Sequence, residues 1–342
     1  MSANIRDVAE KAGVSVGTVS NVLNHREKVS PDAVRRVREA IEELGYVRND
    51  AARQLRVGRS STVGLVVLDV RNPFFTDLAR GAESEAARHG LSVILGNSDD
   101  DVEREAGYLD LFEEQRVRGI LISPYREIGP HLRRLRARGT PAVLVDRRSE
   151  DEQFSSVSVD DDHGGWLAAN HLIETGRRRI LFTGGPFDIR QIVDRQAGAR
   201  RAVDGADGVA FETLPTPGAS VADGRSTGDA IAARPRQDRP DAVFAANDLI
   251  AMGVLQGLAG RGIRVPDEIA IIGFDDIVFA SAAVVPLSSV RQPSQLMGET
   301  ALRVLLEEID DPTSAARQIV FEPELVVRAS TASAMPGPAT GR

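Results

Sequence analysis

The sequence predicts a small all-helical N-terminal domain followed by a larger α/β region made of two doubly wound lobes. Residues 4–44 carry apolar side chains at helical spacing, whereas from residue 62 short apolar runs alternate with amphipathic segments. Near-continuous apolar strands that alternate with helices are typical of parallel sheets covered on both faces. These segments are too numerous for one sheet, so we expect two similar lobes.

Three short helices are predicted in residues 4–45. The first ends at Gly13, and Ser15 is placed to cap the second by accepting a backbone N–H. The third begins at Ser30-Pro31, a cap followed by proline at the first helical position, and ends at Gly45. The expected inward side chains are Ile5, Val8, Ala9, Ala12, Val19, Val22, Leu23, Val34, Val37, Ile41 and Leu44. Two short helices joined by a tight turn form a shape that fits a DNA groove.

The α/β region gives a regular series of expected elements. Strands are expected at residues 62–70, 91–96, 119–123, 142–146, 156–159, 180–183, 242–246 and 269–274. Helices are expected at 75–89, 104–115, 130–138, 162–175, 195–203, 222–233, 249–261 and 294–309. The last stretch, 330–342, is small and polar and is expected to be disordered.

Composition excludes several classes of protein. The 342 residues include no Cys, so a disulfide framework, a thiolate nucleophile and a cysteine-ligated zinc are all excluded. No apolar run resembles a secretory signal or a membrane span, which predicts a cytoplasmic protein without a membrane partner.

Charge is distributed unevenly along the chain. The net charge is −8, but residues 1–60 hold 11 Lys and Arg against 8 Asp and Glu, leaving 31 against 42 for the remainder. The N-terminal region therefore carries +3 and the rest carries −11. A basic head on an acidic body favours contact with DNA phosphates at the head alone.

Polar and aromatic side chains gather where the predicted strands end. Small molecules bind beyond the carboxyl ends of strands in doubly wound sheets. Carboxylate, amide and guanidinium groups suit the vicinal hydroxyls of a sugar, and an aromatic ring suits its C–H face. The strand-end candidates are Asn72, Phe74, Phe75, Ser123, Asp146, Arg147, Asn247, Asp248, Asp275 and Asp276. Helix capping is the competing interpretation for Asn247 and the better one for Asp248, and Trp166 is expected to be a packing residue.

An enzyme is the first alternative, and one sequence feature points toward it. Residues 224–228, with Ser226 between two glycines, match the G-x-S-x-G pattern of hydrolase nucleophiles. That fold needs a His after the Ser, but all five His residues precede Ser226. Lys11 and Lys28 offer no phosphate-binding G-K-[ST], and no His spacing suggests a metal site. We therefore expect no catalysis, no metal and no cofactor.

Three sets of residues carry a family resemblance. They are Asp7-Val8-Ala9 with Ala12-Gly13-Val14-Ser15, Thr18-Val19-Ser20 and Val22-Leu23-Asn24; Gly45-Tyr46 with Asn49, Ala52 and Leu55; and Ala246-Asn247-Asp248 with Gly273-Phe274-Asp275-Asp276. In that order they resemble the head, the hinge and the effector domain of the LacI family of bacterial transcription regulators. The resemblance covers nearly the whole chain. It implies a body like that of type I periplasmic sugar-binding proteins.

The resemblance also implies a division of the chain. Residues 1–47 would form a helix-turn-helix head, 48–60 a hinge, and 61–329 a two-lobed domain for ligand binding and dimerisation. The chain would cross between lobes near residues 160, 280 and 320. The sequence departs from the family at Arg48, where proline is common. The outer face of Val16, Gly17 and Asn21 also differs from that of the repressor after which the family is named.

The DNA-binding residues follow from the chemistry of this surface and from the resemblance. The Asn21 amide can pair with an adenine edge, Val16 can meet a thymine methyl, and Gly17 allows close approach. In the manner of the family, Leu55 from two subunits would wedge into a central base step of the minor groove. The full expected set is Arg6, Ser15, Val16, Gly17, Thr18, Ser20, Asn21, Asn24, Asn49, Arg53, Leu55 and Arg56.

For the effector, the resemblance aligns Arg195, Asn247 and Asp275 with the usual contacts of the family. The full expected set is Asn72, Phe74, Phe75, Ser123, Asp146, Arg147, Arg195, Asn247 and Asp275. The expected function is repression of carbohydrate-utilisation genes by a homodimer on a near-palindromic operator, controlled by a small effector, expected to be a sugar. The alternatives are a nucleoside or purine effector, an activator, and a transport solute-binding protein. The last would need a secretion signal instead of a head.

Overall fold

The computed structural model describes residues 3–46 and 60–332, without the side chain of Asn24. The chain divides into two compact units, Met1–Arg59 and Ser60–Arg342, and each is considered by itself. The predicted hinge residues Asn49, Arg53, Leu55 and Arg56 lie outside the described residues.

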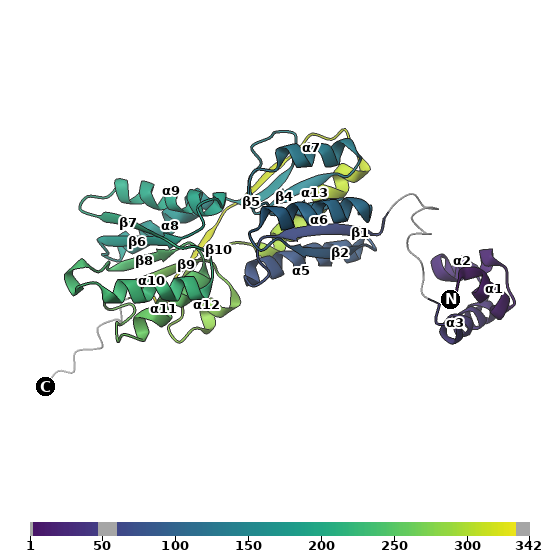
Figure 1. The fold of residues 1–342 in the computed structure, drawn as a ribbon, viewed down its shortest axis with the longest axis horizontal. Coiled ribbons are helices and arrows are strands. Elements are labelled where there is room, and N and C mark those ends of the chain that lie inside the picture. The colour runs from purple at the N-terminus through teal and green to yellow at the C-terminus, as the bar shows by residue number, and fades with distance from the viewer. Residues whose placement is uncertain (1–2, 47–59, 333–342) are drawn as a thin grey trace. The chain divides into compact units, whose positions relative to one another are not determined.

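The first unit contains the predicted helices α1 (Ile5–Ala12), α2 (Val16–Asn24) and α3 (Pro31–Leu44), with the short 3-10 helix η1 (Arg26–Lys28) between α2 and α3 (Figure 1). Gly13 and Gly45 end α1 and α3 with φ of 61° and 57°, a left-handed conformation that favours glycine. The Ser15 hydroxyl accepts the Thr18 N–H, as the cap prediction requires. One small core, centred on the fully buried Val8, Val19 and Val37, holds the three helices together.

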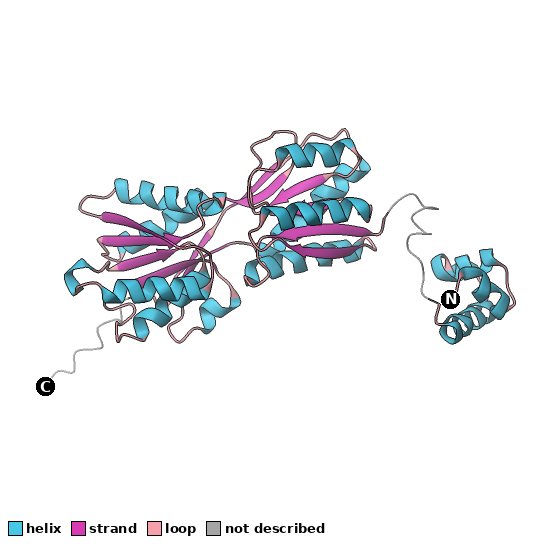
Figure 2. Cartoon of the chain, viewed as in Figure 1, coloured by secondary structure: helices cyan, strands magenta, loops and turns pink. Residues whose placement is uncertain are grey.

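The second unit contains two six-stranded sheets, each flanked by helices (Figure 2). Lobe 1 is the sheet of order β11-β5-β4-β3-β1-β2, with all neighbours parallel. Its strands are β1 (Thr62–Val67), β2 (Ser92–Asn97), β3 (Ile120–Ile122), β4 (Ala142–Val145), β5 (Ser156–Val159) and β11 (Gln318–Phe321). Helices α5 (Pro73–Arg88) and α13 (Ser294–Asp310) pack together on one face, and α6 (Val102–Glu114) and α7 (Gly129–Ala137) cover the other.

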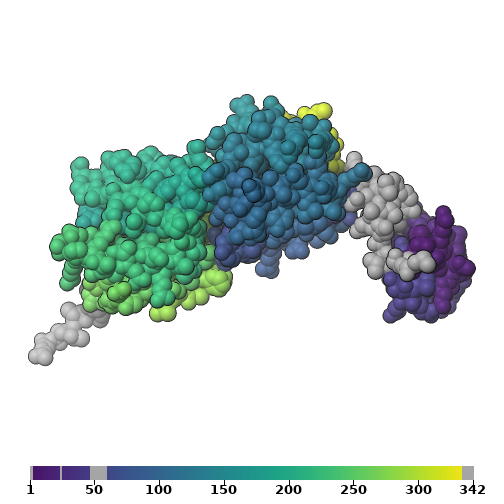
Figure 3. Space-filling view, in the orientation of Figure 1, coloured from purple at the N-terminus to yellow at the C-terminus, as the bar shows by residue number. Residues whose placement is uncertain are grey.

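Lobe 2 is the sheet of order β12-β10-β9-β8-β6-β7, parallel except for β12. Its strands are β6 (Arg179–Gly184), β7 (Ala210–Pro215), β8 (Ala242–Ala245), β9 (Ala270–Asp275), β10 (Ser288–Arg291) and β12 (Glu324–Val326). Helices α8 (Asp161–Glu174) and α9 (Arg190–Asp204) form one packed pair, and α10 (Val221–Ala233) and α11 (Asp248–Ala259) form another. The short helices η2 (Arg236–Asp238) and α12 (Val278–Ala282) lie in connections. The surfaces of the two lobes meet in the space-filling view of Figure 3.

The chain passes between the lobes three times in the described region. The first passage follows β5 at Asp160, and the third lies between β11 and β12 at residues 322–323. The second lies at residues 292–293, later than the expected position near 280. The reason is that β10 remains in the sheet of lobe 2 before the chain enters α13. We call these three segments crossovers 1, 2 and 3.

The G-x-S-x-G pattern is explained by helix packing. Gly224 and Gly228 lie on α10 and face Gly253 and Gly257 on α11. A Cβ added at Gly253 would lie 2.1 Å from the carbonyl oxygen of Val221, so only glycine permits this approach of two backbones. Ser226 is exposed on α10 and its hydroxyl donates to the Ala222 carbonyl.

The C-terminal prediction needs a correction at Ser330 and Thr331. Both are fully buried, and the Ser330 hydroxyl accepts the Ser288 N–H at 2.8 Å. The Thr331 hydroxyl is 2.7 Å from that of Ser288. The ordered chain therefore extends past residue 329.

The described helices include none that is both long and apolar enough to cross a membrane.

Candidate functional site

A cavity of about 60 Å³ lies between the two lobes, at the carboxyl ends of the strands. Seven of the expected ligand-binding residues line it: Asn72, Phe74, Phe75, Asp146, Arg195, Asn247 and Asp275. The sequence prediction missed the other lining residues, which are Leu68, Asp69, Asp100, Ile189, Gln191, Ile192, Ala219 and Ala246. Four of these, Leu68, Asp69, Asp100 and Ala246, lie within a few residues of the ends of β1, β2 and β8. Ile189, Gln191 and Ile192 were missed because α9 begins at Arg190, earlier than predicted.

Arg195 is the central cation of the cavity. Its Nε donates to Asp161 Oδ1 and its Nη1 to the Ala246 carbonyl, both at 2.8 Å. Nη1 also lies 3.6 Å from Asp275 Oδ1, and the guanidinium carbon lies 3.7 Å from the centre of the Phe274 ring. The side chain is only 7% exposed, so two carboxylates and an aromatic face stabilise a charge removed from water.

Asp275 is the last residue of β9 and reaches into the cavity. Its carboxylate accepts hydrogen bonds at 2.8 Å from the Asn72 and Gln292 amides. Burial raises the pKa of Asp275 above its usual value, although Arg195 opposes that shift. Asn72 belongs to lobe 1, so its contact with Asp275 joins the lobes directly.

Asp146 provides a second contact across the cavity. It follows β4 in lobe 1, adopts a φ of 63°, and accepts a hydrogen bond from the Gln191 amide of lobe 2 at 2.8 Å. Burial raises the pKa of Asp146 well above its usual value, and the charge of Asp161 raises it further. Its other oxygen, Oδ1, is buried without a hydrogen-bond partner, and so is the Gln191 Oε1. The cavity thus presents two acceptors that lack donors.

Lobe 1 also supplies the aromatic wall. Asn72 caps α5 by accepting the Phe74 N–H at 3.1 Å, which fixes the two following rings. Phe74 and Phe75 lie edge to face, with centroids 5.0 Å apart and ring planes at 72°. Asp100 lines the same side with a φ of 57°, and burial together with the charges of Asp69 and Asp99 raises its pKa to about 6.

Two expected cavity residues are placed elsewhere. Ser123 is fully buried behind the lining, and its hydroxyl lies 3.5 Å from Asp146 Oδ2. Arg147 points away toward Glu127, at 3.4 Å, and lines a neighbouring cavity with Arg190 and Asp194. Both residues follow β4, but Asp146 lines the cavity and Arg147 does not.

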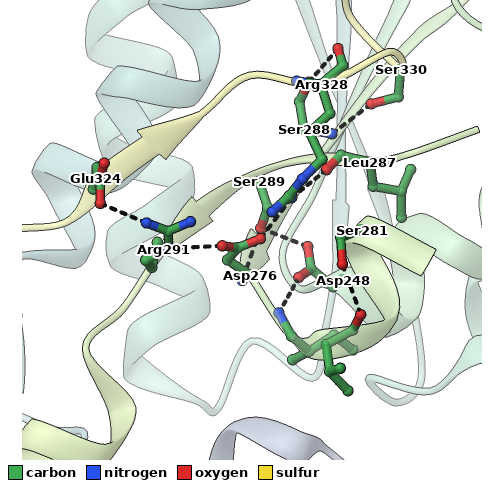
Figure 4. Close-up of polar contacts among 12 residues, drawn as sticks. Asp248, Asp276, Ser281, Leu287, Ser288, Ser289, Arg291, Glu324, Arg328 and Ser330 are labelled. Carbon is green, nitrogen blue, oxygen red and sulfur yellow. Dashed lines mark hydrogen bonds and ion pairs between the residues drawn. The ribbon is translucent and has the colours of Figure 1, made fainter. Parts of the chain in front are cut away.

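The capping interpretation applies to Asn247 rather than to Asp248. Asn247 Oδ1 accepts the Ile250 N–H at 2.8 Å, and its amide donates to the Ala219 carbonyl. Asp248 is fully buried and accepts hydrogen bonds from the Ile277 N–H and the Ser289 hydroxyl. Burial raises the pKa of Asp248 well above its usual value. Figure 4 shows Asp248 in a polar network with Asp276, Arg291 and Arg328.

In the first unit, the expected recognition residues lie on the outer side of α2 or near it. Val16 is 42% exposed, and Gly17, Asn21 and Arg6 are also exposed. Ser15 and Thr18 share a contact between their hydroxyls at 2.9 Å, and Thr18 and Ser20 are half-buried. The described residues contain no group of three or more His, Cys, Asp or Glu able to hold a metal ion.

Comparison with known proteins gives family matches for both units and relatives that span most of the chain. Residues 4–49 match the family model "Bacterial regulatory proteins, lacI family", and residues 169–331 match "Periplasmic binding protein-like domain". The "HTH-type transcriptional repressor PurR" of Vibrio atlanticus is 34% identical, over 96% of this chain and 98% of that protein. The "Ribose operon repressor" of Bacillus subtilis is 38% identical, over 89% of this chain and 91% of that protein. A crystal structure of the lac repressor dimer, bound to operator and an anti-inducer, matches with a TM-score of 0.81 and 25% identity over 97% of this chain and 100% of that chain.

A helix-turn-helix unit joined to a two-lobed body with a cavity between the lobes defines a DNA-binding transcriptional regulator, not an enzyme. The chain belongs to the lacI family of bacterial regulatory proteins.

Proposed function

We propose that this regulator is a cytoplasmic repressor of carbohydrate-utilisation genes and that its effector is a monosaccharide. It would bind a near-palindromic operator as a homodimer, because one head reads too few base pairs for specificity. The effector would occupy the cavity between the lobes and change operator affinity through the angle between them. The relatives named for ribose and purine repression, and the operator-bound lac repressor dimer, support this general scheme.

The observation that carries the sugar proposal is the imbalance of hydrogen-bonding groups in the cavity. The amides of Asn72, Gln191 and Asn247 already donate to protein oxygens. Asp146 Oδ1 and Gln191 Oε1 are buried acceptors without partners. A ligand rich in donors would satisfy them, and each sugar hydroxyl brings one donor.

The shape of the cavity agrees with this chemistry. The Phe74 and Phe75 rings form an apolar wall, which suits the C–H face of a sugar ring. A cavity needs roughly 10–15 Å³ to admit one water molecule, so about 60 Å³ leaves room for a small ligand.

A purine is the second candidate, favoured by the relatives named PurR. A flat heterocycle could lie against the Phe wall. Its ring nitrogens are divided between donors and acceptors, however, whereas every hydroxyl of a monosaccharide can donate to the unpaired acceptors of the described cavity. This imbalance ranks the monosaccharide first.

At the DNA end, the expected roles are sequence readout by Val16 and Asn21 and phosphate contact by Arg6, Thr18 and Ser20. Asn24, Asn49, Arg53, Leu55 and Arg56 would complete the interface, with Leu55 as the minor-groove wedge. Activation instead of repression is the alternative, because the sign of the effect depends on the position of the operator.

The test combines thermal unfolding with operator release. D-ribose, D-xylose, D-glucose, cellobiose, hypoxanthine, guanine and adenosine are added separately to the full-length protein and to its complex with a duplex selected from a random library. We expect a monosaccharide to raise the Tm and to change duplex affinity, as binding to the native state requires. A response to purines alone, or to none of these compounds, would contradict the monosaccharide proposal.

A further inference from the structure

The turn that carries Asp275 into the cavity has an unusual backbone. Asp275 and Asp276 are consecutive residues with positive φ, 101° and 53°. Residues with a side chain adopt this region at an energetic cost, so the surrounding structure must hold them there. The contacts of Asp276 show what provides that hold.

The backbone of the turn is fixed by two buried side chains. The Asp276 N–H donates to the Ser289 hydroxyl at 3.0 Å, and the Ile277 N–H donates to Asp248 Oδ2 at 2.8 Å. The Ser289 hydroxyl in turn donates to Asp248 Oδ1 at 2.7 Å. Ser289 lies on β10 and Asp248 begins α11, so two neighbouring elements of lobe 2 hold the turn.

The carboxylate of Asp276 provides the third attachment and points away from the cavity. Its side chain is 6% exposed and lies between two guanidinium groups, with Arg291 Nε at 2.8 Å and Arg328 Nη1 at 2.6 Å (Figure 4). Arg291 also contacts Glu324 at 3.0 Å, and Arg328 donates to the Leu287 carbonyl at 2.7 Å. The contacts of the buried Asp276 carboxylate are charge-assisted, and the one with the largely buried Arg328 is the better shielded from water.

The two arginines belong to the segments that join the lobes. Arg291 ends β10, immediately before crossover 2. Glu324 begins β12, immediately after crossover 3, and Arg328 lies two residues beyond the end of β12. On the other side of the turn, Gln292 of crossover 2 donates to Asp275 Oδ1 at 2.8 Å. Asp275 and Asp276 thus attach the wall of the cavity to two of the three crossovers.

The geometry points to Asp276 as a positioning residue for effector recognition: clamped between Arg291 and Arg328, it holds Asp275 in the orientation that faces the cavity. Asp276 itself does not line the interlobe cavity. The inference rests on the proposed function, because it assumes that the effector binds beside Asp275. The orientation of Asp275 would then depend on the positions of crossovers 2 and 3.

The test uses full-length Asp276→Asn, which keeps the size of the side chain and removes its charge. D-ribose, D-xylose and D-glucose are titrated by calorimetry well below the Tm of each variant. We expect at least a tenfold loss of affinity for the monosaccharide that the wild-type protein binds. Glu212→Gln is the matched control, because Glu212 accepts two hydrogen bonds from Arg234 at 2.7 and 2.6 Å but lies outside the cavity lining. It should bind like the wild type.

A double variant, Asp276→Asn with Arg328→Gln, separates positioning from general stability. Removing both charges relieves the unpaired buried guanidinium, so the Tm should recover toward the wild-type value. Monosaccharide affinity should stay at least tenfold weaker, because the turn is still unclamped. Recovery of affinity together with the Tm, or wild-type affinity in Asp276→Asn, would overturn the inference.

If the wild-type protein binds none of the three sugars, the proposed function fails while the positioning role is decided by a crystal structure of unliganded Asp276→Asn. Loss of the hydrogen bonds from Asn72 and Gln292 to Asp275 would support the role. An unchanged Asp275 with both hydrogen bonds intact would overturn it.

Discussion

The two lobes contribute to the cavity in different ways. In lobe 2, Arg195 is held by Asp161 and Ala246, Asn247 caps its own helix, and Asp275 lies in a turn held by Asp276. These partners all belong to lobe 2. In lobe 1, the Asn72 amide donates to Asp275 and Asp146 accepts from Gln191, so these polar groups find partners across the cavity.

This difference indicates that lobe 2 is the preorganised half of the site. Buried polar side chains that find their partners within one lobe are held more rigidly than those paired across the cavity. When the lobes separate, the Asn72 amide loses Asp275 and the Asp146 carboxylate loses Gln191. An effector that first binds lobe 2 could therefore replace the hydrogen bonds between the lobes and then bind the polar groups of lobe 1. The lobes would close on the bound effector, so the closed conformation would depend on the effector being present.

The largest expected effect is that of Arg195→Ala. It removes the centre of the lobe 2 network and leaves Asp161 and Asp275 as buried carboxylates without their cation. Breaking a buried ion pair costs about 3–5 kcal/mol of unfolding free energy, and we expect effector affinity to fall by at least about 100-fold. Calorimetry and thermal unfolding measure the two quantities.

Arg200→Ala is the control for this variant, because Arg200 lies on the same helix over the half-buried Phe211 ring. It should leave both quantities nearly unchanged. Normal effector binding by Arg195→Ala would show that lobe 2 is not the preorganised half.

A smaller effect is expected from Asp146→Asn in lobe 1. The amide keeps an oxygen that can accept from Gln191, while the charge that burial disfavours is removed. Unfolding free energy should therefore stay the same or rise, and effector affinity should fall about tenfold, because the amide nitrogen that replaces Oδ1 donates and cannot accept from a ligand hydroxyl. A loss as large as that of Arg195→Ala would erase the distinction between the lobes.

The sequence predicts site residues that follow a local pattern, and it does not predict roles that depend on partners far away in the chain. Asn72, Asp146, Asn247 and Asp275 were found because parallel strands end at one edge of a sheet, and short strand-end segments are recognisable in sequence. The sequence places Asp276 at a strand end but indicates no role for it, since its partner Arg328 is 52 positions away in the chain and no local pattern links them.

The missed strands share a different cause. β10 begins with two serines, and β7, β11 and β12 are largely exposed or half-buried, so none shows the apolar run of a central strand. Their omission placed crossover 2 too early and shortened the ordered C-terminal part. Helix boundaries set by caps, such as Ser30 before α3, were predicted from residues that act locally.

The smallest expected effect concerns pH and Asp100 on the lobe 1 side. Its pKa is raised to about 6 by burial and by the charges of Asp69 and Asp99, so the folded protein binds this proton more tightly than the unfolded chain. Its contribution to stability is thus largest at low pH and declines as pH rises through about 4 to 6. Asp100→Asn should remove that part of the decline, and thermal unfolding between pH 4 and 8 measures it. An unchanged slope in the variant would exclude this role for Asp100.

Hydrogen exchange of the unliganded protein tests the preorganisation of lobe 2 most directly. The amides of Asp276 and Ile277 donate to Ser289 and Asp248 in lobe 2, whereas those of Val70 and Phe74 donate to Asn97 and Asn72 in lobe 1. We predict that the lobe 2 pair exchanges at least about tenfold more slowly than the lobe 1 pair. Equal rates, or faster exchange at Asp276 and Ile277, would contradict the account.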